Sequence, residues 1–171
     1  MGIKTFCEKS NCKIGGITDD VIYLPVFIPD LPKQIEIKGN ILYVKNEFHI
    51  SLVCIKKIEE KYNVKIPNFL NMIINDFCEF NKINTLELLH YNNNYRFVAR
   101  DDLKSVIVMC EILNLNKFFD LINRKYGLNI EYPPTHVTLY TLKDSIGIYL
   151  IDSSDIKNLT NLIDNPIGRL L

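Results

Sequence analysis

Residues 48–55 read Phe-His-Ile-Ser-Leu-Val-Cys-Ile, and residues 135–142 read Thr-His-Val-Thr-Leu-Tyr-Thr-Leu. Both stretches are rich in β-branched and aliphatic residues, which favours β-strands. Each contains one four-residue motif of histidine, aliphatic residue, hydroxyl residue and leucine. Residues two apart in a strand point to the same face. The first motif (residues 49–52) and the second motif (residues 136–139) therefore each present an imidazole beside a hydroxyl, while their aliphatic residues anchor in the core.

The four polar residues of the motifs are His49, Ser51, His136 and Thr138. Two imidazoles can act as general base and general acid near neutral pH, because unperturbed histidine has a pKa of about 6.5. Two hydroxyls can donate hydrogen bonds to phosphate oxygens as charge develops on them. Phosphodiester cleavage uses this set. The motifs offer neither carboxylates nor a third imidazole for a metal. We expect metal-independent cleavage, with both histidines facing one cleft and not the core.

The motifs stand 87 residues apart, at positions 49 and 136, and they resemble the paired His-x-Ser/Thr-hydrophobic motifs of the 2H phosphoesterase superfamily. The resemblance covers roughly residues 20–160. It implies a bilobal α+β domain with an antiparallel sheet and helices on the outer faces, and it makes the four motif residues catalytic. Members include cyclic phosphodiesterases and 2′-5′ RNA ligase-like proteins. The implied substrate is a nucleotide or RNA end with a 2′,3′-cyclic phosphate or a 2′-5′ linkage. Which histidine is the base stays open.

Two alternative functions also stay open. One is hydrolysis of cyclic di- or oligonucleotide immune messengers in a viral or phage evasion role. The frequent use of Ile, Lys and Asn is typical of an AT-rich genome and is compatible with such a source. The other is a module that binds RNA ends without turnover, although two intact motifs argue against it.

Three further residues are candidates for substrate binding. Tyr140 follows Thr138 by two residues, so strand alternation predicts that it faces the same cleft and stacks on a base; packing at a sheet end is an equal alternative. Arg96 and Arg100 are two of four arginines on one face of an expected strand, where they could pair with phosphate. Solvated hairpin charge is the simpler interpretation of each arginine. His90 lacks a hydroxyl residue two positions on, which indicates a structural histidine.

Composition limits the class of protein. The 171 residues carry 20 Lys and Arg against 20 Asp and Glu, which argues against an extended nucleic-acid footprint. The longest apolar run, residues 21–28, contains Pro25 and is far shorter than the roughly 20 residues that span a membrane. The N-terminus has no signal-like apolar run, and the five cysteines lack zinc-site spacing. We expect a cytoplasmic monomer without cofactor or metal.

The remaining pattern predicts one α+β domain over residues 1–171, with residues 1–18 as a loosely held extension. Strands are expected at residues 21–28, 34–38, 41–44, 48–55, 86–90, 95–100, 105–112, 135–142 and 146–151. Residues 92–94, three consecutive asparagines, are expected to form a turn. Helices are expected at residues 56–62, 67–81, 116–126 and 154–163.

Overall fold

The computed structural model describes residues 17, 18, 20–142, 147–169 and 171, and it contains nine strands and four helices among them. The strands are β1 (Ile17–Thr18), β2 (Val21–Val26), β3 (Gln34–Ile37), β4 (Asn40–Val44), β5 (Phe48–Cys54), β6 (Leu88–Arg100), β7 (Leu103–Ile112), β8 (His136–Thr141) and β9 (Thr160–Ile163). The helices are α1 (Ile55–Tyr62), α2 (Phe69–Ile83), α3 (Leu115–Tyr126) and α4 (Ser153–Leu159). The prediction of an α+β fold is confirmed.

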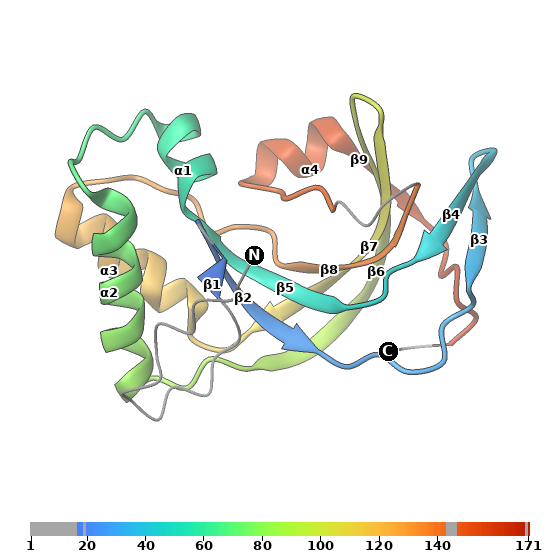
Figure 1. Cartoon of the computed structure of the whole chain (residues 1–171), viewed down its shortest axis with the longest axis horizontal. Coiled ribbons are helices and arrows are strands. Elements are labelled where there is room, and N and C mark those ends of the chain that lie inside the picture. The colour runs from blue at the N-terminus through green and yellow to red at the C-terminus, as the bar shows by residue number, and fades with distance from the viewer. Residues whose placement is uncertain (1–16, 19, 143–146, 170) are drawn as a thin grey trace.

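The strands form one antiparallel sheet in the order β1-β2-β5-β8-β7-β6-β9. Strand β8 is interior: it pairs with β7 on one side, and on the other side with β5 and with β4 of the β3–β4 hairpin. The two motif strands, far apart in the chain, are thus neighbours in the sheet. Figure 1 shows α1, α2 and α3 gathered toward one end of the sheet and the β3–β4 hairpin at the other. No helix in the described part of the chain is long and apolar enough to cross a membrane.

The two faces of the sheet have different coverings, which follows from the alternation of side chains along β7. Val106 and Val108 point into the main core, whereas Ile107 points into a second, smaller cluster. The main core includes apolar faces of α2 and α3 at helical spacing, built from Phe69, Ile73, Phe77, Phe80, Leu115, Phe118, Phe119 and Ile122. The smaller cluster lies under α4 and contains Val98, Ile107, Ile148 and Leu150. Thr138 is the cross-strand partner of Ile107, so the polar residues of the second motif share the face of the smaller cluster.

Each motif strand carries a β-bulge at the leucine that ends its motif. Between the pairs Tyr23↔Ser51 and Ile22↔Val53, strand β5 contains the extra residue Leu52. Between the pairs Ile107↔Thr138 and Val106↔Tyr140, strand β8 contains the extra residue Leu139. A bulge shifts the alternation of side chains by one residue. The face that each histidine and hydroxyl share therefore ends at the bulge.

The expectation of two strands separated by a turn at residues 92–94 is wrong. Strand β6 runs unbroken through residues 92–94, because the extra residues are absorbed as an irregularity between Tyr91 and Tyr95, with Asn93 at a φ of 48°. The turn lies instead at Asp101, between β6 and β7, where φ is 53°. At the N-terminus, Ile17–Thr18 pairs with β2, and residues 1–16 lie outside the described residues.

The C-terminal elements also differ from the prediction. The helix expected at residues 154–163 ends at Leu159, and Thr160–Ile163 forms strand β9 on the edge of β6. Asp152 caps α4 by accepting hydrogen bonds from the backbone N–H groups of Ser154 and Asp155. The strand expected at residues 146–151 is absent from residues 147–151, which run as irregular chain; residue 146 is not described. Ile148 and Leu150 are nevertheless buried.

Candidate functional site

The two motifs meet through one cross-strand pair at their centres. Ile50 of β5 pairs with Val137 of β8 in antiparallel register. One residue outward in each direction, this register sets His49 opposite Thr138 and Ser51 opposite His136. The four polar side chains therefore form a quadrilateral on one face, with the histidines at opposite corners. Diagonal neighbours across an antiparallel pair lie about 7–8 Å apart, which leaves room for a phosphoryl group between the imidazoles.

A cleft of about 400 Å³ opens over this quadrilateral. All four motif residues line it, so the structure brings together the residues that the motifs single out. The described residues that line it are Val21, Tyr23, Lys45, Glu47, His49, Ser51, Cys54, His136, Thr138, Gly147, Ile148 and Tyr149. The side chains beneath the cleft, Ile50 and Val137, are fully buried and hold both strands against the main core.

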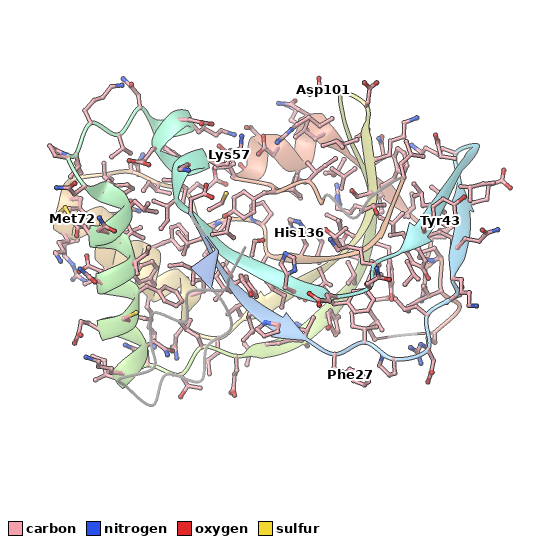
Figure 2. The ribbon with its side chains drawn as sticks, viewed as in Figure 1. Phe27, Tyr43, Lys57, Met72, Asp101 and His136 are labelled. Atoms are coloured by element: carbon pink, nitrogen blue, oxygen red, sulfur yellow. The ribbon has the colours of Figure 1, made fainter. Side chains whose placement is uncertain are left out.

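His136 forms the buried end of the site. Its side chain is 7% exposed, and Figure 2 shows it near the centre of the molecule in that view. Nδ1 lies 2.8 Å from the carbonyl oxygen of Pro134. A carbonyl only accepts hydrogen bonds, so Nδ1 carries the proton and Nε2 of the neutral ring keeps its lone pair. Burial lowers the pKa of His136, and hydrogen bonding to the backbone of Pro134 and Ile148 opposes this only in part.

His49 forms the open end of the site. It keeps substantial solvent contact, and its ring packs against the ring of Tyr23, with centroids 5.3 Å apart at an angle of 58°. The walls of the cleft remove part of its hydration and lower its pKa, and the positive charge of Lys45, together with that of His136 whenever its ring is protonated, adds to that shift. The carboxylate of Glu47 opposes them. The pKa shift of His49 thus favours its neutral form in the empty cleft, and its exposed ring stays within reach of protons from solvent.

Three residues that line the cleft next to the first motif are not among the site residues predicted from the sequence. Lys45 and Glu47 lie in the short connection between β4 and β5, where strand alternation does not apply, and their closeness to His49 along the chain is the one signal that the sequence offers for them. Tyr23 is the cross-strand partner of Ser51, and only the pairing of β2 with β5 reveals it. Together they add one cation, one carboxylate and one aromatic ring to the cleft.

The irregular segment at residues 147–149 covers the second motif. A Cβ atom at Gly147 would lie 2.9 Å from Oγ1 of Thr138, closer than side chains pack, so only glycine lets this segment approach the motif hydroxyl. Tyr149 lines the inner part of the cleft beside Cys54, and burial raises its pKa. No feature of residues 147–149 marks them as site residues in the sequence, because the contact with Thr138 is made by folding.

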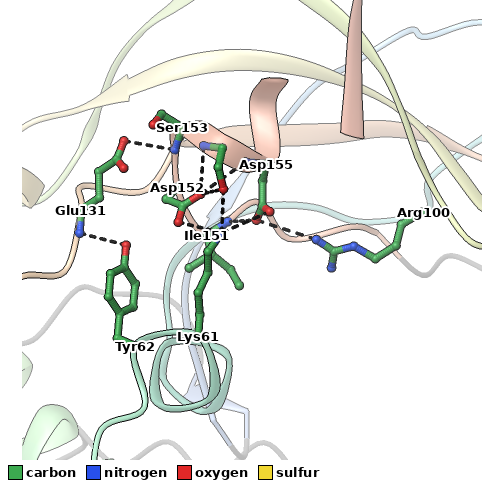
Figure 3. Close-up of polar contacts among 9 residues, drawn as sticks. Lys61, Tyr62, Arg100, Glu131, Ile151, Asp152, Ser153 and Asp155 are labelled. Atoms are coloured by element: carbon green, nitrogen blue, oxygen red, sulfur yellow. Dashed lines mark hydrogen bonds and ion pairs between the residues drawn. The ribbon is translucent and has the colours of Figure 1, made fainter. Parts of the chain in front are cut away.

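An ion-pair network anchors the chain directly after this segment (Figure 3). Nζ of Lys61 on α1 lies 2.6 Å from Oδ2 of Asp152 and 3.3 Å from Oδ1 of Asp155. Asp155 Oδ2 accepts a hydrogen bond from the backbone N–H of Ile151 at 2.7 Å. Burial opposes ionisation of Asp152, but the hydrogen bonds from Lys61 and Ser154 lower its pKa on balance. The network ties the cleft-covering segment to the helix that follows the first motif.

The three substrate-binding candidates outside the motifs do not line the cleft. Tyr140 is 0% exposed and belongs to the main core. The bulge at Leu139 reverses the alternation of side chains after Thr138, so the prediction that Tyr140 faces the cleft is wrong. Arg96 donates from Nε to Oγ1 of Thr160 at 2.7 Å. Arg100 lies 3.7 Å from a carboxylate oxygen of Asp155. Both arginines hold elements of the fold together.

His90 lies on the exposed part of β6, with Nε2 3.8 Å from a carboxylate oxygen of Glu111, and takes no part in the cleft. Among the described residues, no group of three or more His, Cys, Asp or Glu side chains is arranged to hold a metal ion. No family model matches the chain, and no curated protein or solved structure matches it significantly. The geometry of the cleft is therefore the basis for assigning a function.

Proposed function

We propose that the protein is a metal-independent phosphodiesterase of the 2H type, a single domain over residues 1–171 with the bilobal arrangement of that superfamily. The proposed substrate is a nucleotide or RNA end that carries a 2′,3′-cyclic phosphate or a 2′-5′ linkage. The observation that carries the proposal is the quadrilateral of two imidazoles and two hydroxyls at the centre of the sheet. Each histidine stands opposite the hydroxyl of the other motif, so a phosphate between them meets one acid–base group on each side.

The surroundings of the two histidines support different roles. His136 is buried, and its Nδ1–H group donates to the Pro134 carbonyl, so its neutral ring can offer the lone pair of Nε2. We assign it as the general base. His49 stays in contact with solvent, and a bound phosphate anion favours its protonated form, as Glu47 does. We assign it as the general acid.

The proposed step on a cyclic phosphate is a direct displacement by water. Nε2 of His136 removes a proton from the water as its oxygen forms a bond to phosphorus. The bond from phosphorus to one ribose oxygen breaks, and that oxygen takes the proton of His49. Ser51 and Thr138 donate hydrogen bonds to the non-bridging oxygens, where charge increases in the transition state. The product is a nucleoside monophosphate, and the two histidines end with their protonation states exchanged.

The size of the cleft favours a substrate in which one nucleotide is recognised. About 400 Å³ is near the lower end of the roughly 300–1,000 Å³ typical of small-molecule sites. A nucleotide at the end of an RNA fits this description as well as a free mononucleotide does.

The test is turnover of a substrate panel: 2′,3′-cyclic mononucleotides, 2′-5′ oligoadenylate and cyclic dinucleotides. We expect hydrolysis of a 2′,3′-cyclic or 2′-5′ substrate that persists in excess EDTA. Turnover of cyclic dinucleotides alone would instead support the messenger hydrolase. Nucleotide binding without any turnover would support a binding module. Loss of activity in EDTA with recovery on adding Zn²⁺ or Mn²⁺ would contradict the mechanism.

A further inference from the structure

We propose that Lys45 is the phosphate-binding cation of this cleft and that Glu47 beside it restricts the cleft to ligands with a single phosphate. This proposal names the ligand class of the same site and so rests on the proposed function. Neither residue belongs to a motif.

Lys45 and Glu47 lie where the chain passes from one partner strand of β8 to the next. Val44 of β4 pairs with Tyr140, and Ile50 of β5 pairs with Val137, so the residues between them run alongside the second motif strand on one side of it. The backbone N–H of Lys45 donates to the carbonyl oxygen of Leu139 at 3.0 Å. This bond fixes Lys45 beside the residue that follows Thr138, and its side chain lines the cleft.

The charges of the cleft single out this lysine. Lys45 is the one lysine or arginine among the described residues that line the cleft, and Arg96 and Arg100 are engaged elsewhere. Its charge acts on the imidazole of His49, the group proposed to protonate the leaving oxygen. A phosphate between the histidines would therefore lie within the field of Lys45.

Glu47 sets the limit on negative charge. It also lines the cleft, and its carboxylate acts on both Lys45 and His49. With Lys45 positive, Glu47 negative and His49 protonated, one phosphodiester anion brings the local charge to zero. A second phosphate would add negative charge near the Glu47 carboxylate, and no second lysine or arginine among the described lining residues would match it, which disfavours such a ligand.

The experiment measures binding of two adenosine ligands that differ in phosphate number, adenosine 2′-monophosphate and adenosine 2′,5′-bisphosphate, by titration calorimetry at about pH 5.5. At this pH each phosphate monoester carries close to one negative charge, as a phosphodiester does, because its second pKa is about 6. The intact chain should bind the monophosphate more tightly. Lys45→Met should weaken both ligands by roughly tenfold or more, since a charge-assisted contact is lost, and Lys45→Arg should restore most of the affinity. Glu47→Gln should tighten the bisphosphate more than the monophosphate.

The matched controls are Lys82→Met and Glu79→Gln, which remove the charges of an exposed ion pair on α2 and should change neither affinity. Equal affinities of Lys45→Met and the intact chain, with unchanged melting temperatures, would overturn the inference, as would absence of binding by the intact chain. Because the readout is binding, the predicted pattern without any turnover would uphold this inference while the proposed hydrolysis fails. Turnover of substrate together with ligand affinities that do not change in Lys45→Met would uphold the proposed hydrolysis and overturn this inference.

Discussion

The two motifs share the order histidine, aliphatic residue, hydroxyl residue and leucine, yet their histidines lie in different environments. His136 on β8 is 7% exposed and hydrogen-bonded to a backbone carbonyl. His49 on β5 lies at the open end of the cleft against the ring of Tyr23. The difference comes from what covers each strand: residues 147–149 fold over the second motif, while the first motif faces solvent. Equivalent motifs in sequence thus hold one buried and one accessible histidine, to which the proposed function gives the roles of base and acid.

The largest expected effect is loss of turnover, and it should be similar for both motifs. His49→Ala and His136→Ala should each lower kcat/KM by about 10²- to 10⁴-fold, because each removes a general acid or base. The two residues act as a unit, so the double variant should be little slower than either single variant. Steady-state kinetics on the substrate found by the panel tests this. Near-normal rates in either single variant would exclude that histidine from the chemistry.

The next effect separates the motifs by stability. His136→Ala removes a buried partner of the Pro134 carbonyl and should lower the free energy of unfolding by about 1–3 kcal/mol. His49→Ala should change it by less than about 0.5 kcal/mol, because its side chain is exposed. This revises the expectation that both histidines face only a cleft. Urea denaturation of the two variants measures the difference, and equal losses would contradict the asymmetry.

The pH dependence of stability should show the same asymmetry. The pKa of His136 is lower in the folded chain than the unfolded value of about 6.5. The unfolded chain therefore binds the proton first as pH falls, and stability is lost below about pH 6.5. His136→Gln should lose less stability than the wild type between pH 7 and pH 5. A variant whose stability falls as steeply as that of the wild type would show that another group is responsible.

An effect on the rate that is smaller than that of losing either histidine concerns the glycine that covers the second motif. Gly147→Ala would set a Cβ atom 2.9 Å from Oγ1 of Thr138, displacing the hydroxyl and costing on the order of one charge-assisted hydrogen bond, about 1.5–3 kcal/mol of barrier. Thr138→Ala should cost a similar amount and removes the oxygen that the new Cβ atom meets. The double variant should therefore be no slower than Thr138→Ala alone. Additive losses in this kinetic cycle would mean that Gly147 acts through something other than Thr138.

The smallest effect concerns the ring beside the first motif. Tyr23→Leu removes the aromatic contact with His49 and should cost about 0.5–1.5 kcal/mol, seen in kcat more than in KM if Tyr23 positions the imidazole. Tyr23→Phe keeps the ring and should behave as the wild type does. A loss in Tyr23→Phe as large as in Tyr23→Leu would indicate a role for the hydroxyl instead.

The local alternation of polar and apolar residues is enough to predict the two motif strands, which strand pairing brings together in the sheet. The alternation in residues 48–52 and 135–139 predicts both motif strands and the face that each histidine shares with its hydroxyl. The same rule applied one step too far misplaces Tyr140, because the bulge at Leu139 depends on the register with β7. Bulges leave no mark in a single sequence, since they are set by the partner strand.

The cleft residues that the sequence analysis does not predict fall into two groups: those that the local sequence can indicate and those that only tertiary structure brings to the cleft. Lys45 and Glu47 directly precede the first motif strand in the sequence, so their position in the chain is a signal for them. Tyr23 and Gly147 have no such signal, because they reach the cleft only through strand pairing and through a segment that folds over the second motif. The sequence predicts a helix where β9 lies, because the few residues of β9 gain a strand partner only when the edge of β6 is in place.

The dependence of kcat/KM on pH tests the central claim, that a buried base and an accessible acid face each other across the phosphate, most directly. The pKa of each histidine is lowered in the empty cleft, and kcat/KM reports the groups of the free enzyme. The account predicts a bell-shaped profile with its maximum below about pH 6.5. The residual activity of His136→Gln should lose the acidic limb, and that of His49→Gln the alkaline limb. A rate that rises steadily with pH, or a wild-type profile that keeps both limbs in either variant, would contradict it.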